Sequence, residues 1–136
     1  MSSISVIWKG NVAYVDVLKK DSILHVIGFM RDQLHAKRSF FMILDTSRIE
    51  SPPPLADAKL LSEFMKTSKD ALIQYLKGTA LHIPFTLCRL FIKAAFAIQP
   101  PSTPVQLVTS TEEGQQYIQQ MQKNSNKRII HNPFIQ

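Results

Sequence analysis

Short blocks of apolar residues alternate with apolar residues at helical spacing along most of this chain. Gly10 and Asn11 separate the first two blocks, and a two-residue Gly-Asn connection is typical of a β-hairpin. The block at 40–44 contains no polar residue, which is typical of a strand covered on both faces. The pattern predicts strands near 5–9, 12–17, 40–44, 79–83 and 105–108.

Between these blocks, apolar residues recur three and four positions apart, as they do on one face of a helix. Gly78 is expected to end one helix and Pro84 to begin the next. Ser110 or Thr111, followed by two acidic residues, is expected to open the last helix. The pattern predicts helices over about 22–36, 55–66, 69–77, 85–98 and 111–123. The expected order is β-β-α-β-α-β-α-β-α, in which the short segment 69–77 is counted with the second helix because it follows that helix directly. This order predicts an α/β fold with a mixed β-sheet packed by about four helices.

Three consecutive prolines, Pro52 to Pro54, lie between the buried strand at 40–44 and the helix that follows it. Proline has no backbone N–H and a fixed φ, so these residues exclude helix and central strand until Leu55. Asp45 closes the strand. A strand, a loop at its carboxyl end and a helix form the arrangement in which α/β proteins usually place a functional site. The residues of this loop are therefore the first candidates for function.

The same junction resembles the STAS domain, the anti-sigma-factor antagonist (SpoIIAA-like) family, in which a strand ends in Leu-Asp-Leu-Ser-Gly-Val and an Asp-Ser pair opens a helix. Here Leu-Asp-Thr-Ser-Arg-Ile at 44–49 takes the place of the first element. The order of the predicted elements is also that of the family. Pro53 and Pro54 stand where the family has its aspartate and its phosphorylatable serine. The resemblance implies a single STAS-like domain over 1–123, without the phosphoserine switch, similar to divergent STAS-like proteins of undetermined function.

Asp45, Ser47 and His82 are the candidate ligand-binding or loop-organising residues. His82 lies in a predicted strand that ends near the proline loop, so it is expected to approach Asp45 or Ser47. One interpretation is a hydrolytic trio; the other is a half-buried histidine beside a carboxylate that holds the loop by accepting its backbone N–H groups. The sequence has no glycine-rich phosphate loop and no Gly-x-Ser-x-Gly motif. We therefore predict no catalytic residue and no enzyme.

Composition narrows the class of protein further. Hydrophobic residues make up 45% of the chain and charged residues 19%, as in ordinary globular domains. The four histidines and the single cysteine form no zinc-binding pattern, so we expect neither a metal nor another cofactor. Cys88 lies in an apolar helix next to Arg89, which leaves open an inert core thiol or one with a lowered pKa. One cysteine, no bilayer-length apolar run and no signal-peptide pattern predict a cytoplasmic protein.

The net charge of +6 is concentrated towards the carboxyl end, where Lys123, Lys127 and Arg128 are accompanied by no acidic residue. We expect 124–136 to be a basic and apolar tail. It is either a solubilising spacer or a peptide that docks on a protein surface, with weak contact to nucleic acid or another anionic surface as a further option. The candidate contact residues in the tail are Lys127, Arg128, Ile129, Ile130 and Phe134.

The helix at 85–98 is apolar around most of its circumference, which indicates burial on more than one side. The residues expected to cover the sheet are Leu87, Leu90, Phe91, Ala94 and Ile98. The other apolar side includes Ile92 and Phe96. It is covered either by neighbouring helices and the tail or by a partner, and we predict that Ile92 and Phe96 contact a partner.

Two classes of function follow from these patterns. The favoured one is a non-catalytic protein–protein interaction module, an adaptor or assembly subunit that binds another protein or a second copy of itself. The alternative is a small-ligand-binding or hydrolytic α/β protein that uses the loops around Asp45, Ser47 and His82. Convergence of these side chains on an open pocket would favour the alternative.

Overall fold

The computed structural model describes residues 3–19 and 22–131, with the backbone alone described from residue 125 onward. These residues form one sheet in the order β1-β2-β3-β4-β5, in which β1 is antiparallel to β2 and the other neighbours are parallel. The strands are β1 (Ile4–Lys9), β2 (Val12–Val17), β3 (Phe40–Asp45), β4 (Leu76–His82) and β5 (Val105–Val108). The helices are α1 (Ile23–His35), α2 (Leu55–Thr67), α3 (Lys69–Tyr75), α4 (Thr86–Ile98) and α5 (Thr111–His131). The predicted α/β class, mixed sheet and element order are confirmed.

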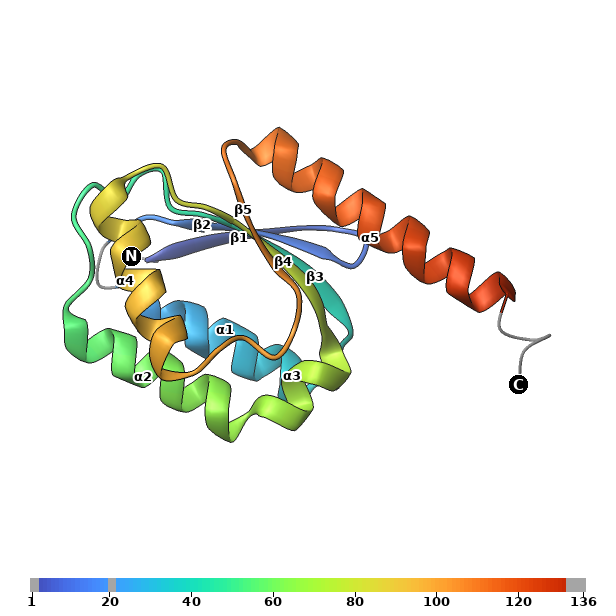
Figure 1. The fold of residues 1–136 in the computed structure, drawn as a ribbon, viewed down its shortest axis with the longest axis horizontal. Coiled ribbons are helices and arrows are strands. Elements are labelled where there is room, and N and C mark those ends of the chain that lie inside the picture. The colour runs from blue at the N-terminus through green and yellow to red at the C-terminus, as the bar shows by residue number, and fades with distance from the viewer. Residues whose placement is uncertain (1–2, 20–21, 132–136) are drawn as a thin grey trace.

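The helices are divided unequally between the two faces of the sheet. Figure 1 shows α1, α2, α3 and α4 on one face, while α5 lies alone on the other and runs past the end of the sheet. Each interface is filled by a cluster of buried apolar side chains, and the cluster beneath α1 to α4 is the larger. The sheet is therefore the middle layer of three.

Strand β3 is buried on both of its faces. Phe40, Met42 and Leu44 belong to the cluster beneath α1 to α4, whereas Phe41 and Ile43 belong to the cluster beneath α5. None of the five side chains is more than 7% exposed. The absence of polar residues from this strand is thereby explained, since alternation is needed only where one face meets water.

Two element boundaries differ from the prediction. Helix α3 ends at Tyr75 and β4 begins at Leu76, so Gly78 lies inside a strand and does not end a helix. A Cβ atom at residue 78 would lie 2.5 Å from Sδ of Met121 in α5, so the glycine leaves room for that side chain. The prediction that Gly78 ends a helix was wrong, because glycine is also used inside strands where another part of the chain packs closely.

Helix α5 continues to His131, eight residues beyond the predicted end at residue 123. The backbone of residues 124–131 is thus helical, and whether this segment is a spacer or docks on a surface stays a prediction. The sequence contains no glycine in this stretch and its first proline is Pro133, so no local signal stops the helix earlier. Phe134 lies outside the described residues.

Helix α5 begins at a capping arrangement and then approaches the sheet closely. Ser110 Oγ accepts a hydrogen bond from the Glu113 N–H at 3.1 Å, and Thr109 Oγ1 donates to the Glu113 carboxylate at 2.6 Å. One turn into the helix, a Cβ at Gly114 would lie 3.3 Å from side-chain carbons of both Ala80 and Ile43. Glycine at this position therefore determines how near the helix lies to the sheet.

We expect Gly114→Val to lower the free energy of unfolding by about 1–3 kcal/mol, because the added side chain would overpack the contact between α5 and the sheet. Gly28→Ala in α1 is the matched control. No atom lies within 4 Å of its new Cβ, and alanine is the better helix former by up to about 1 kcal/mol. Urea unfolding measures the free energy of unfolding of both variants. If both substitutions stabilised the protein equally, α5 could not lie as close to the sheet at Gly114 as described.

Candidate functional site

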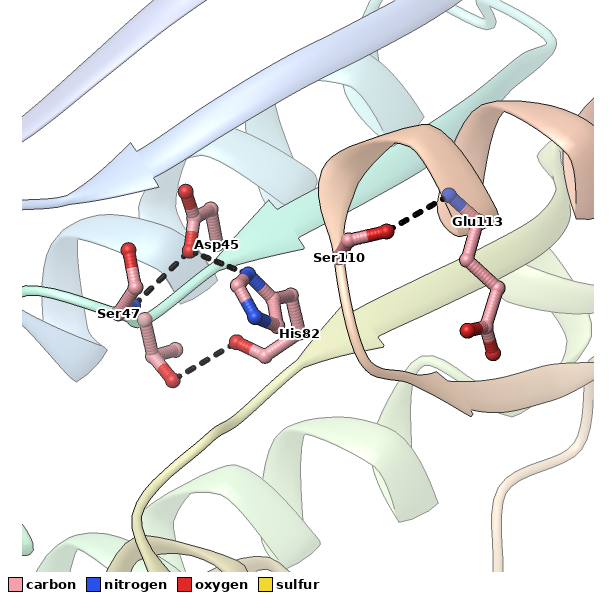
Figure 2. Close-up of polar contacts among 6 residues, drawn as sticks. Asp45, Ser47, His82, Ser110 and Glu113 are labelled. Atoms are coloured by element: carbon pink, nitrogen blue, oxygen red, sulfur yellow. Dashed lines mark hydrogen bonds and ion pairs between the residues drawn. The ribbon is translucent and has the colours of Figure 1, made fainter.

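The carboxyl ends of the parallel strands bring Asp45 and His82 together, as Figure 2 shows. The two residues are register partners at the ends of β3 and β4. Nδ1 of His82 lies 3.0 Å from Oδ1 of Asp45. Their side chains are 15% and 23% exposed, so the pair is half-buried at this edge of the sheet. The expected approach of His82 to Asp45 is thus found.

The loop that leaves β3 is bound to the same two residues. The Ser47 N–H donates to Oδ1 of Asp45 at 2.9 Å, which is the bond expected of a loop-organising carboxylate. The N–H and the hydroxyl of Thr46 both donate to the backbone carbonyl of His82, at 2.9 and 3.0 Å. Asp45 therefore accepts from both a loop backbone and a neighbouring strand, and this local network fixes the path of the chain towards the prolines.

The chemistry available at this edge is limited. A hydrolytic trio requires the Ser47 hydroxyl to donate to the His82 ring, and within the described residues no such hydrogen bond exists. The hydroxyl of Thr46 donates to the backbone carbonyl of His82 and not to its ring, and the hydroxyl of Ser110 caps α5 (Figure 2). Among the described residues, no group of three or more His, Cys, Asp or Glu side chains is arranged to hold a metal ion. The site resembles an organised loop more closely than a catalytic centre.

We expect Asp45→Ala to lower the free energy of unfolding by about 1–3 kcal/mol, because the Ser47 N–H and the His82 ring would both lose their acceptor. Asp45→Asn, which keeps one oxygen acceptor, should cost less. The exposed residue Asp32 supplies the control variant Asp32→Ala. Urea unfolding ranks the three, and an Asp45→Ala variant as stable as Asp32→Ala would show that the network contributes nothing.

Cys88 is buried against the loop that contains the prolines. Its thiol is 5% exposed and donates to the backbone carbonyl of Ile49 at 3.3 Å. Burial raises the pKa of the Cys88 thiol, because a thiolate would lose its hydration there. Of the two possibilities left by the sequence, the structure supports the inert core thiol, and Arg89 is exposed to solvent.

Alkylation of Cys88 by iodoacetamide at pH 8 should accordingly be at least tenfold slower in the folded protein than in urea. Only the thiolate reacts, and the raised pKa together with burial lowers its accessible amount. The rate should increase as the pH rises. Mass spectrometry of samples quenched over time measures both rates, and a folded-state rate equal to that in urea would rule out the buried thiol.

Of the side chains of α4 predicted to cover the sheet, Phe91 is buried as expected, but Leu87, Leu90 and Ile98 are exposed. Cys88, Phe91 and Ala95 are its buried residues, and Ile92 and Phe96 are half-buried and pack against the same core. The side predicted to meet a partner thus faces the sheet and α2. The two faces could not be told apart by composition, since both are apolar.

The outward side of α4 is a row of apolar side chains, which we call the outer row and define as Leu87, Leu90, Ala94 and Ile98. Leu87 is 59% exposed, Leu90 52% and Ile98 58%. Their spacing of three, four and four residues places them on one stripe of the helix. The prediction that these residues cover the sheet is wrong for the three large side chains, while Ala94 is half-buried.

The tail residues predicted to contact a partner are placed only by their backbone. Lys127, Arg128, Ile129 and Ile130 lie in the part of α5 that projects from the domain in Figure 1. Gln122 Nε2 of α5 donates to Oδ1 of Asn11, in the turn between β1 and β2, at 3.0 Å. Within the described residues, no helix combines the length and the apolar character needed to cross a membrane.

Comparison of this chain with protein-family models, with curated proteins and with solved structures finds no match.

Proposed function

We propose that this protein is a non-catalytic interaction module that binds a partner protein through the outer row of α4. The observation that carries the proposal is the exposure of Leu87, Leu90 and Ile98, each more than half accessible to solvent. Complete burial of one such side chain contributes roughly 1.5–3 kcal/mol. A helical stripe of this kind is therefore a sufficient anchor for a protein partner, and exposed apolar rows commonly mark such sites.

The charges around the outer row indicate the chemistry of the partner. Arg89 and Lys93 are exposed on α4, which contains no acidic residue. A second copy packed on the same row would bring these cations towards their own kind, which is unfavourable. We therefore infer an amphipathic helix with acidic residues beside its apolar stripe, docked along α4.

The sequence of the proline junction agrees with an adaptor role. Its resemblance to STAS domains favours a domain that acts through protein contacts. Pro54, which immediately precedes α2, offers no hydroxyl for phosphorylation. Partner binding in this proposal is consequently independent of a phosphoserine at that position.

A second candidate function is ligand binding or hydrolysis at the carboxyl edge of the sheet. It is favoured by the hydrogen bond between Asp45 and His82, at an edge where α/β proteins commonly bind ligands. It ranks below the interaction module because Asp45 also holds the loop through Ser47, and no hydroxyl nucleophile is hydrogen-bonded to the His82 ring within the described residues.

We expect Leu90→Asp to weaken partner binding at least tenfold and to leave the fold intact, since the side chain is exposed and its burial in the complex would be lost. Leu24→Asp, at a 55% exposed position on α1, is the matched control and should bind as the wild type does. The partner is first recovered by crosslinking and identified by mass spectrometry. Affinities are then measured with purified components by calorimetry at two salt concentrations, and binding should weaken at high salt.

Phe96→Asp separates binding from stability. Phe96 packs against the core, so its replacement by aspartate should lower the unfolding midpoint much more than Leu90→Asp does. Equal loss of affinity in the Leu90→Asp and Leu24→Asp variants would refute the outer row as the binding surface. A concentration-dependent dimer disrupted by Leu90→Asp would identify a second copy as the occupant instead of an acidic helix.

A further inference from the structure

An apolar cavity of about 90 Å³ lies between the sheet and the helices that cover it. Met42 of β3, Met30 of α1 and Met65 of α2 contribute to its walls, and Ile92 and Phe96 of α4 close it on another side. Its only polar side chains are hydroxyls, and no charged group lines it. The cavity lies on the opposite face of the sheet from α5.

A second cavity of about 50 Å³ continues from the first towards the proline loop. Pro53 and Cys88 line this smaller space together with Lys19 and Thr46, so its lining, unlike that of the larger cavity, includes a charged residue. Ile92 belongs to the walls of both cavities, together with Leu44 and Val26. The side chain of Ile92 thus takes part in dividing one apolar space into two.

The lining determines what the larger space can hold. A water molecule needs two to four polar partners, and a wall surface that is almost entirely apolar, despite the hydroxyl residues Thr79, Ser102 and Thr103, makes this a poor site for one. An ion would lose its hydration without compensation. A hydrocarbon group, by contrast, would restore the dispersion contacts that the empty walls lack. Methionine side chains are flexible, so the three in the wall can adjust to the shape of a guest.

A route to the larger cavity exists on the side of β5. The loop at 101–103 lines the cavity and is itself only half-buried, as are Ile92 and Phe96. This loop has no helix or strand hydrogen bonds of its own in the described structure. This loop is therefore the part of the wall that we infer moves against α4 when a guest enters.

We propose that this cavity binds a small uncharged hydrocarbon group, presented either as a free apolar molecule or as the end of an acyl chain. The proposal does not depend on the outer row, because the cavity lies on the inner side of α4 and its lining contains none of the outer-row residues. Its volume sets the size of the guest. Engineered apolar cavities of about 150 Å³ hold xenon or benzene, so the present one suits the smaller of these.

Methyl NMR of methionine tests the proposal in the folded, full-length protein. The chain has five methionines, of which Met30, Met42 and Met65 line the cavity. Met121 belongs to α5, on the other face of the sheet, and serves as the internal control. Xenon should shift the three lining methyl signals in a saturable manner and leave Met121 unchanged. No saturable shift, or an equal shift at Met121, would overturn the proposal.

Replacement of Ile92 tests the location of the site. Ile92→Ala should join the two cavities into a space close to that which holds benzene, so benzene should bind this variant at least tenfold more tightly than the wild type. Ile92→Val removes less of the side chain, so its affinity for benzene should lie between those of the wild type and Ile92→Ala. This variant replaces Ile92→Ala in the test if the alanine variant does not fold. Benzene affinity that does not increase in either variant would place the xenon site elsewhere and overturn the assignment.

A series from hexanoate to decanoate distinguishes the two forms of guest. If the end of an acyl chain enters, the dissociation constant should fall about fourfold for each added methylene that is buried, and the same three methyl signals should shift. If these acids leave the three signals unchanged while xenon and benzene shift them, the guest is a free apolar molecule. Shifts that appear with the acids at Met121 as strongly as at Met42 would reflect nonspecific association and count against the proposal.

Discussion

The burial of β3 on both faces is the constraint on which the rest of this structure depends. Its five apolar side chains require cover above and below the sheet, and α1 to α4 supply one layer while α5 supplies the other. A single helix covers the second face because Gly114 and Gly78 allow it to lie close to the strands. The central position of β3 also explains the place of Asp45, which leaves the buried strand beside the end of β4.

Helix α4 is the element in which packing and proposed function meet. Its inner side packs against α2 and the core beneath the sheet. Phe91 and Ala95 are buried there, while Leu87 and Leu90 remain in solvent. Apolar side chains on both sides of an outer helix are not required by the fold. Helix α2 also exposes Leu55 and Leu60, but Glu63 and Lys66 share its exposed face, whereas α4 contains no acidic residue.

The candidate site shows which contacts local sequence can predict. Asp45 and His82 end two predicted strands, and the ends of neighbouring parallel strands share one edge, so their approach follows from the order of elements. The role of Ser47 does not follow, because it depends on the torsion angles of a loop. The loop presents the backbone N–H of Ser47 to the carboxylate and thereby turns a possible catalytic trio into a structural network.

The sequence by itself determined the number, type and order of the elements, because strand and helix periods and stop signals are local properties of the chain. It also determined that β3 is covered on both faces, since no polar residue interrupts it. Only the tertiary structure decided which side of α4 faces inward, because both sides are apolar and the choice depends on how the helix docks on the sheet and α2. The same holds for Gly78 inside β4. A larger residue there would collide with Met121, which lies far along the chain. Contacts between distant residues have no signature in a local pattern.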